Sequence, residues 1–423
     1  ACRTEQGLSK ASLEHYLKVC GKQFSKLLSS QQVQAEADRV WCGVERCLFG
    51  NGKELHFKKL MDFDTIGGKS NKNGARFDLD AMYVNWLGLS LKCYLPKSEN
   101  SLSYVWESLK GKISYCNIKR LMFSSGWRYY AEIVVSGDAP TRVLIGTSTM
   151  GIDPGVSTIA GVSEDACVLE ELAPNAIQYE KKIQKISQSM DRSRRISNSN
   201  KYNEDGTINR SNRDPWKYSK NYVKMRRLLK SLYRKKHAYI IDSHRELCNK
   251  LITIAKYFPV EKMHFQALQK KAKETRRQEK KTEVKQKNGT VKVIRKYKRK
   301  KRFGRSINRR APARFLLELK RKAEAVGGVY AEVDTKEFKA SQYNHVTDTY
   351  EKIPLSQREK EIGNRKVQRD LYSAFLIRNA DLDFKHPDRE KCEYEFEYFA
   401  DMQEQLILKM KESGLSMRQC FGF

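Results

Sequence analysis

The sequence predicts an α+β protein of several domains, with helical regions at both ends and sheet-forming regions between them. The chain has 423 residues, which is enough for two or three domains with separate cores. Apolar residues recur at helical spacing in 8–48 and then alternate with polar residues in parts of 76–147. Beyond residue 147, short apolar runs are separated by long helical patterns. This order excludes an all-helical or an all-β fold.

The charge balance predicts a polyanionic partner. Lys and Arg number 82 against 50 acidic residues, so the formal net charge is +32. A surplus of this size repels itself in a compact fold unless a polyanion neutralises it. Nucleic acid is the partner we expect, because the basic residues are clustered and aromatic residues lie among them. A generally basic protein, or one that binds anionic membranes, is the alternative.

Cysteine usage and hydropathy indicate a reducing compartment. The ten cysteines include no Cys-x-x-Cys pair, which is typical of free thiols. No apolar run approaches the ~20 residues of a membrane span, and the first residues contain no apolar signal core. We therefore predict a cytoplasmic protein with no membrane partner.

The N-terminal third divides into helices and strands. Residues 1–75 are predicted to form a helical recognition region that ends in a glycine-rich loop. Residues 76–147 contain several β-branched and aromatic runs punctuated by Lys and Arg. They predict a β-barrel (a wedge domain) or a β-sandwich, with a helical insertion on its N-terminal side.

A short hairpin around Asp153 is the centre of the functional prediction. Asp153 ends an apolar run, Pro154 and Gly155 turn the chain, and a second apolar run returns. An Asp-Pro-Gly turn needs no function by itself. Asp153 becomes a candidate only together with other carboxylates.

A basic helical hairpin is predicted in 175–255. Its second helix has apolar residues on one side and basic residues on the other. Such a face can be merely solvated, or it can hold a nucleic-acid backbone. The expected nucleic-acid contacts of this helix are Arg226, Arg227, Lys230, Arg234 and Lys235.

A basic segment at 269–302 is predicted to be mobile in the free protein. Between residues 269 and 310, 20 of 42 residues are Lys or Arg and three are acidic. The segment lacks the apolar residues that a core needs. Arg305, Arg309 and Arg310, which follow it, are further expected nucleic-acid contacts.

Without its insertions, residues 148–333 and the helix near 367–380 give three strands, a helix, a strand, a helix, a strand and a helix. This order fits the ribonuclease H topology, with Asp153 on the first strand, Glu261 ending the fourth and Asp370 on the last helix. Hydrolysis of a phosphodiester by two hard cations requires converging carboxylates. Carboxylates without a histidine cluster favour Mg²⁺, or Mn²⁺, over zinc. Asp153, Glu261 and Asp370 are therefore the predicted catalytic and metal-binding residues, and the neighbouring Arg369 is predicted to contact phosphate or to pair with an acid.

Four motifs resemble those of a known nuclease family. Residues 151–156 (GIDPGV), 260–268 (VEKMHFQAL) and 369–374 (RDLYSA) are similar to the three RuvC-type motifs of TnpB-like (OrfB) transposon nucleases, which are relatives of compact type V CRISPR effectors. Residues 303–306 (FGRS) with 310–312 (RAP) resemble the link into the following helix. The resemblance implies an RNA-guided DNA endonuclease with two Mg²⁺ ions, a guide RNA and target DNA as partners, in a prokaryotic, nucleoid-associated location. The transposon or CRISPR association and the oligomeric state stay open.

Two departures from the family pattern matter. The insert at 334–366, in the position of a target-nucleic-acid-binding domain, contains no cysteine, so no zinc ribbon is expected and packing must hold the insert, or it stays mobile. The second motif can also be aligned so that Gln266 occupies the acidic position, which would leave the nuclease inactive. Glu261 is preferred because it ends an apolar strand, and Glu332 and Asp334 are the nearest substitutes. Residues 367–423 are predicted to supply the last nuclease helix and a helical tail.

Two other functions remain open at this point. One is a guide-RNA-dependent DNA-binding protein or repressor that does not cleave. The other is a basic RNA-binding scaffold of unrelated fold.

Overall fold

The computed structural model describes residues 7–50, 52–58, 62–269, 277–285, 290–297, 303–354, 356–415 and 421–422. Its internal contacts divide the chain into two compact units, each described here by itself. The first unit comprises residues 1–140 and 186–231, and the second comprises 141–185 and 232–423.

The first unit begins with two capped helices. Ser9 and Ser29 each accept a hydrogen bond from the backbone three residues on, and they begin α2 (Lys10–Gly21) and α3 (Ser30–Leu48). A 3-10 turn, η1 (Lys22–Phe24), follows α2. The helical prediction for 8–48 therefore agrees with the structure.

The strands of the first unit form two separate sheets. One contains β1 (Thr65–Ile66), β5 (Ile113–Phe123) and β6 (Gly126–Val135) in the order β1-β5-β6. The other contains β2 (Arg76–Asp78), β3 (Tyr83–Trp86) and β4 (Leu89–Lys92), and α4 (Glu99–Ser108) follows it. Among the described strands no pairing joins the two sheets, so the predicted closed barrel is not present. Alternation predicted the strands, but it does not specify which strand edges pair.

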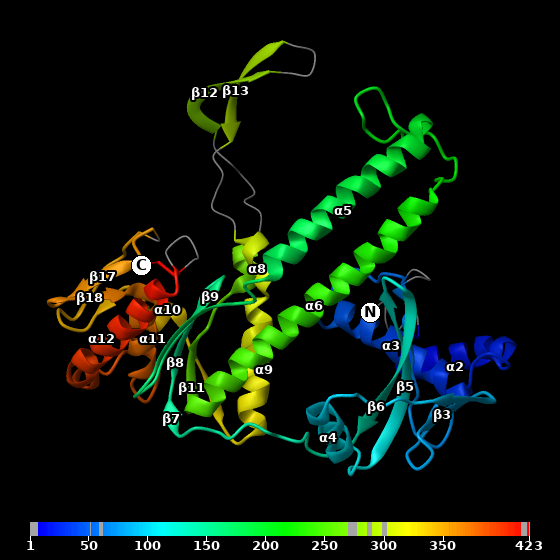
Figure 1. The fold of residues 1–423 in the computed structure, drawn as a ribbon, viewed down its shortest axis with the longest axis horizontal. Helices are drawn as coiled ribbons and strands as arrows, with labels where there is room; N and C mark the ends of the chain where they lie inside the picture. The colour runs from blue at the N-terminus through cyan, green and yellow to red at the C-terminus, as the bar shows by residue number, and fades with distance from the viewer. Residues whose placement is uncertain are drawn as a thin grey trace. The chain divides into compact units, whose positions relative to one another are not determined.

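A long helical hairpin follows residue 175. Helices α5 (Ala176–Ser197) and α6 (Lys220–Ile254) run antiparallel (Figure 1), joined by a segment that includes η3 (Ser199–Lys201). Within the second unit, the Lys236 ammonium lies 2.9 Å from a Glu180 carboxylate oxygen and ties the two helices together.

The second unit is built on a six-stranded mixed sheet. Its strands are β7 (Ser148–Thr149), β8 (Gly151–Pro154), β9 (Thr158–Val162), β10 (Cys167–Glu171), β11 (Ala255–Glu261) and β14 (Val329–Val333). The order is β10-β9-β8-β11-β14, and β7 also pairs with β11. The first three strands are antiparallel, while β11 runs parallel to β8 and β14.

Each face of this sheet is covered by a different set of helices. On one face, Ile152 and Val260 pack in a core with the end of α6 and with α9 (Pro312–Ala325), which follows α8 (Gly304–Arg310). On the other face, Ala160, Leu169 and Val333 pack against α11 (Arg369–Arg378) and α12 (Arg389–Glu412). Because side chains alternate along a strand, the residues after Ile152 and Val260 lie on the α11 face.

Packing holds the insert at 334–366 in the structure. It forms α10 (Thr335–Phe338), the hairpin β15 (Tyr343–Asn344) with β16 (Thr349–Tyr350), and the hairpin β17 (Glu359–Ile362) with β18 (Arg365–Gln368). Phe338, Tyr343 and Ile362 are buried in the same core as α11. His345 is also buried, and its Nδ1 lies 2.8 Å from the Tyr372 hydroxyl.

The basic segment contains a hairpin that the sequence did not predict. β12 (Arg277–Lys285) and β13 (Val291–Tyr297) pair in antiparallel fashion within the segment that was predicted to be mobile. The sequence of these strands contains β-branched residues, which favour strands, among many charged ones: Thr282, Val284, Val291, Val293 and Ile294. Residues 270–276, 286–289 and 298–302 lie outside the described residues, and a short helix, α7 (Phe265–Gln269), precedes them. No helix in the described parts of the chain is long and apolar enough to cross a membrane.

Candidate acidic site

Asp153 and Glu261 lie next to each other at the ends of two adjacent parallel strands. Ile152 on β8 is paired with Val260 on β11, and the two acids are the next residue of each strand. Both acids therefore project to the face that α11 covers. The sequence predicted these strand ends, and the register brings them together across more than a hundred residues of sequence.

The two carboxyl groups share a hydrogen bond, and their pKa values are perturbed. Burial, then the charges of Glu261 and Asp370, raise the pKa of Asp153 well above its ordinary value, while Arg369 opposes the shift. Burial likewise raises the pKa of Glu261, although its hydrogen bond with Asp153 lowers it. The hydrogen bond between the two carboxyl groups offsets part of the repulsion between two close carboxylates.

Asp370 reaches this region from the first turn of α11. Helix α11 approaches β8 closely at Gly151, where an added Cβ would lie 2.2 Å from the carbonyl oxygen of Ala374. Glycine at 151 is therefore required for this approach. Asp370 lies one helical turn before Ala374, close enough for its charge to act on both Asp153 and Glu261.

Arginines hold the carboxylate of Asp370. Its Oδ1 accepts hydrogen bonds from Nη2 and Nε of Arg369 at 3.0 and 3.2 Å. Its Oδ2 accepts one from Nη1 of Arg358 at 3.3 Å. Among the described residues, no group of three His, Cys, Asp or Glu side chains is placed so that it could hold a metal ion. The three acids are thus electrostatic neighbours, while the arginines engage one of them.

The alternative acids and the alternative register lie elsewhere. Gln266 is exposed on α7, beyond the end of β11, and Glu261 is the residue beside Asp153. Glu332 pairs with Val260 across the sheet, so it projects to the opposite face, where its carboxylate lies 3.0 Å from the Lys262 ammonium. Asp334 caps α10. None of these three side chains replaces Glu261 in the structure.

The donor set of the acidic site fits a hard divalent cation. Oxygen ligands from carboxylates are those that Mg²⁺ and Mn²⁺ prefer. Asp153 and Glu261 share a proton in a place where their charges repel, which is the position that a cation would take. Asp370 would join them only by exchanging its arginine contacts.

Another motif contacts the hairpin that carries Asp153. The Ser306 hydroxyl donates a hydrogen bond of 3.1 Å to the Val156 carbonyl, so the 303–306 segment contacts the 151–156 segment. This contact spans 150 residues of sequence. The segments singled out by the resemblance are therefore joined in space.

The predicted nucleic-acid contacts fall into two groups. Arg226, Arg227 and Lys235 are exposed on α6 and Arg305 is exposed on α8, while Lys230 and Arg234 are partly buried. The Lys230 ammonium lies 4.9 Å from the ring centroid of Trp127.

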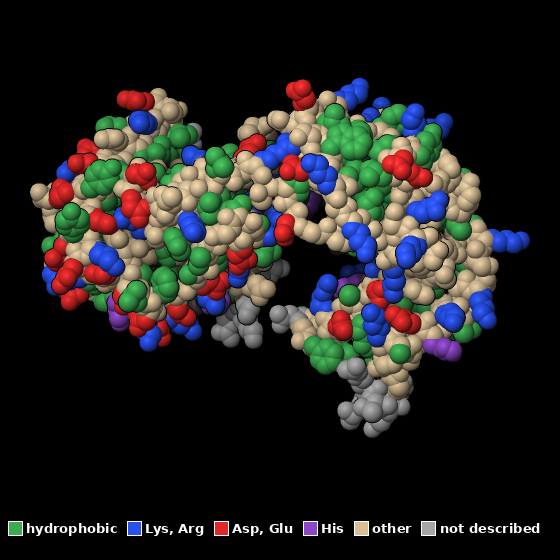
Figure 2. All heavy atoms as spheres, turned by 90° about the horizontal axis from the view of Figure 1, so that it is seen from below, with side chains coloured by type: hydrophobic (Ala, Val, Ile, Leu, Met, Phe, Trp, Pro, Cys, Tyr) green, Lys and Arg blue, Asp and Glu red, His purple; other side chains and the backbone are tan. Residues whose placement is uncertain are grey.

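The other three predicted arginines are engaged inside the protein. Arg309 pairs with Glu180 at 2.7 Å, buried Arg310 pairs with Glu171, and buried Arg369 pairs with Asp370. The pairs of Arg309 and Arg310 were not predicted, because local charge density does not reveal an acid distant in sequence, whereas pairing with an acid was one of the two roles predicted for Arg369. Basic and acidic side chains are interspersed on the face drawn in Figure 2.

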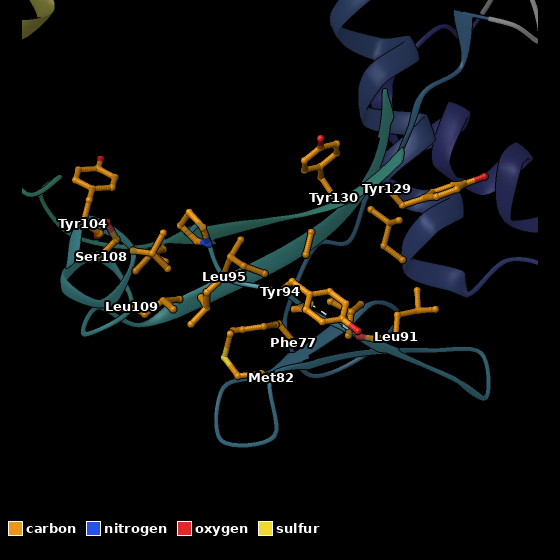
Figure 3. Close-up of a pocket in the computed structure, with 18 of the residues that line it drawn as sticks. Phe77, Met82, Leu91, Tyr94, Leu95, Tyr104, Ser108, Leu109, Tyr129 and Tyr130 are labelled. Atoms are coloured by element: carbon orange, nitrogen blue, oxygen red, sulfur yellow. Dashed lines mark hydrogen bonds between the residues drawn. The ribbon is translucent and has the colours of Figure 1, made fainter. Parts of the chain in front are cut away.

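The sequence did not reveal a large cavity in the first unit. Its volume is about 1610 Å³, and it is bordered by β3 to β6 and α4. Tyr94, Tyr104, Tyr129 and Tyr130 lie around it (Figure 3), each exposed for more than two-fifths of its surface. Arg128 lies 4.7 Å from the Phe123 ring centroid and also lines the cavity. Exposed aromatic faces beside arginines are typical of surfaces on which nucleobases stack.

Arg358 and Lys360, in the insert, were also not predicted. Arg358 contacts Asp370, and Lys360 is buried. Burial and the neighbouring Arg369 lower the pKa of Lys360 to about 8. No sequence spacing marks either residue, since their role depends on a hairpin folding back onto α11.

Comparison with known proteins gives structural neighbours only. No protein-family model matches the chain, and no curated protein matches it. One solved structure, of a Cas12f1-sgRNA-target DNA complex, is 13% identical with a TM-score of 0.47, and the match covers 89% of this chain and 77% of that one. Another, of a CRISPR-Cas12f ternary complex, is 14% identical with a TM-score of 0.30, and the match covers 88% of this chain and 75% of that one. Both matches are similarities in structure at low sequence identity, and at this level they assign neither a family nor a function to the chain.

Proposed function

We propose that the chain is an RNA-guided DNA endonuclease whose acidic site hydrolyses phosphodiester bonds. The observation that carries the proposal is the placement of Asp153 and Glu261 side by side on β8 and β11, with Asp370 brought towards them on α11. Three acids from three distant segments, with raised pKa values at two of them, are typical of a catalytic centre.

The strand order supports a ribonuclease H-like, RuvC-type nuclease domain. Three antiparallel strands followed by two parallel ones, in the order β10-β9-β8-β11-β14, correspond to the topology expected from the sequence. The helical hairpin α5–α6 would be its insertion, and the sheets of the first unit would form a wedge domain with a helical recognition region. This arrangement also fits a TnpB-like, transposon-associated ancestry.

Asp153 and Glu261 would hold a divalent cation, Mg²⁺ or Mn²⁺, and Asp370 would complete the site. When bound, two such ions supply an activated water and stabilise the leaving oxygen. The backbone positions the acids: the pairing of β8 with β11 places Asp153 beside Glu261, and the close contact at Gly151 sets the distance between α11 and β8. Arg369 partly offsets the negative charge.

The net charge and the aromatic cavity support nucleic-acid partners. One solved neighbour is described as a complex with sgRNA and target DNA, and we infer a guide RNA and target DNA as partners here. Exposed Arg226, Arg227 and Arg305 would contact the backbone, while base pairing would supply target specificity. A cytoplasmic, nucleoid-associated location follows from these partners.

Cleavage of a plasmid library with the co-purified RNA and Mg²⁺ tests the proposal. We expect metal-dependent cleavage by the wild type, none by Asp153→Ala, and equal RNA binding by both. Asp242→Ala, at an exposed acid on α6, is the matched control and should cleave normally. Persistent cleavage by Asp153→Ala would refute the assignment of the site.

One observation favours a second function. Arg358 and Arg369 engage both oxygens of Asp370, as they would if the chain bound DNA under RNA guidance without cutting it. In that case, the same library would show guided DNA binding with Mg²⁺ and no cleavage by the wild type.

A further inference from the structure

Arg358 links the acid Asp370 to a separate cavity. The cavity has a volume of about 920 Å³ and lies along the hairpins β15–β16 and β17–β18. The Arg358 side chain lines it and is 36% exposed, while its Nη1 reaches Asp370 Oδ2. One guanidinium is therefore available both to an internal acid and to a ligand in the cavity.

The contact between Arg358 and Asp370 is a weak one. It is a single hydrogen bond of 3.3 Å, whereas Arg369 uses two nitrogens on the other carboxylate oxygen. A single long contact from a partly exposed arginine adds little stability. A guanidinium binds phosphate better, because two of its N–H groups can fit two phosphate oxygens.

The remainder of the cavity lining suits an anion with several acceptor oxygens. Neutral donors come from Gln342, Asn344, Thr347, Thr349 and Gln357. The glutamates of the lining (Glu351, Glu359 and Glu361) are exposed and so are solvated, whereas Lys360 is buried. The Lys360 ammonium has one long contact, of 3.4 Å, to the Tyr343 carbonyl, and it lies over the Tyr372 ring.

We propose that this cavity binds a backbone phosphate of single-stranded nucleic acid through Arg358, and that binding withdraws Arg358 from Asp370 so that Asp370 can join Asp153 and Glu261. Arg358 is thus a positioning residue that couples strand binding to completion of the acidic site. The inference rests on the proposed function, because it takes the three acids as one cation site. Coupling of this kind is reciprocal, so the strand and the cation each strengthen binding of the other.

The test measures Mn²⁺ binding by electron paramagnetic resonance, using the full chain after nucleic acid has been removed from it. Arg358→Gln should bind Mn²⁺ about fivefold more tightly than wild type, because Asp370 no longer has this competing cation. Arg358→Lys keeps the charge and should resemble wild type. The control Arg365→Gln removes an equal charge from β18, where Arg365 pairs with Glu397, and should leave Mn²⁺ affinity unchanged.

A second measurement uses the wild type and does not depend on a variant folding. Short oligothymidylate should tighten Mn²⁺ binding about fivefold, after subtraction of Mn²⁺ bound by the oligonucleotide alone. The uncharged methylphosphonate analogue should have no effect. Tightening by inorganic phosphate but not by oligothymidylate would identify free phosphate as the ligand and overturn the strand-binding part.

The double variant shows whether Arg358 acts through Asp370. In an Asp370→Asn background, Arg358→Gln should give no gain in Mn²⁺ affinity. An undiminished gain there, or no gain in Arg358→Gln alone, would overturn the coupling. Unchanged Mn²⁺ binding by Asp153→Asn would instead refute the acidic site itself, so failure of the coupling and failure of the proposed function are distinguishable.

Discussion

Asp153→Asn should stabilise the protein in the absence of divalent cations and abolish the stabilisation that they give. Asparagine keeps a donor for the hydrogen bond to Glu261 and, unlike aspartate, never carries a negative charge beside it. Such an exchange trades the function of an acidic site for stability.

The magnitude follows from the proximity of the two acids. Two like charges about 4 Å apart at an effective dielectric constant of about 20 repel by about 4 kcal/mol. The shared proton removes most of this cost, so we expect a gain of about 1–2 kcal/mol and a rise in melting temperature of about 2 °C. Mg²⁺ at about 100 times its Kd would stabilise wild type by about 2.7 kcal/mol and the variant hardly at all, which reverses their order.

The stability that Asp153→Asn gains over wild type should increase with pH. Because the folded-state pKa of Asp153 is raised, wild type loses stability as pH rises from the ordinary aspartate value of about 4 towards the raised pKa. The advantage of the variant should therefore grow over that range and then level off. Differential scanning calorimetry at several pH values, with and without Mg²⁺, measures this, and Asp242→Asn is the control. A variant less stable than wild type without cations, or stabilised equally by Mg²⁺, would show that Asp153 is not part of a repulsive, cation-binding pair.

Three more outcomes can be measured on single elements. Gly151→Ala should lower the free energy of unfolding by about 2 kcal/mol or more, because the added Cβ would lie 2.2 Å from the Ala374 carbonyl oxygen. Chemical unfolding should show that the control Gly304→Ala is tolerated, because the nearest atom to its added Cβ lies at 3.9 Å. Burial lowers the pKa of His345 to about 4, so the stability that the neutral imidazole contributes is present above pH 6.5 and is lost as pH falls through about 4. His345→Asn should therefore reduce the fall in melting temperature between pH 6.5 and 4, and an unchanged dependence of melting temperature on pH would contradict this. Replacing Arg226 and Arg227 together by Gln should lower the salt dependence of RNA binding by about one to two phosphate contacts, while Arg365→Gln should not alter it; equal slopes would show that α6 does not touch the backbone.

The central sheet and its acids could be predicted because their signals are local. Apolar runs end at Asp153 and Glu261, and the same alternation that buries Ile152 and Val260 places both acids on one face. The choice of Glu261 over Gln266 followed from the strand end, and the structure places Gln266 on α7 instead.

The features that were missed depend on pairings between distant segments. Strand alternation could not decide whether β1 to β6 close into a barrel or form two sheets, because edge pairing is a tertiary choice. Arg310 belongs to a basic cluster in sequence, yet it is buried against Glu171, which lies 139 residues away. Charge density alone therefore does not show which basic side chains are exposed.

The state of Asp370 decides between the two guided functions. Its position on α11 is fixed by Gln368, whose side-chain oxygen caps the helix at Leu371 N at 2.7 Å, and by the close contact at Gly151. A carboxylate so firmly placed beside Asp153 and Glu261 would be costly to keep if it only paired with arginines, since a buried ion pair is often no more stable than apolar packing. Its charge raises the pKa of both other acids, so the fold bears an electrostatic cost that a cation would relieve. That cost favours the nuclease over the non-cleaving binder, and it makes release of Arg358 from Asp370 the step on which cleavage would depend.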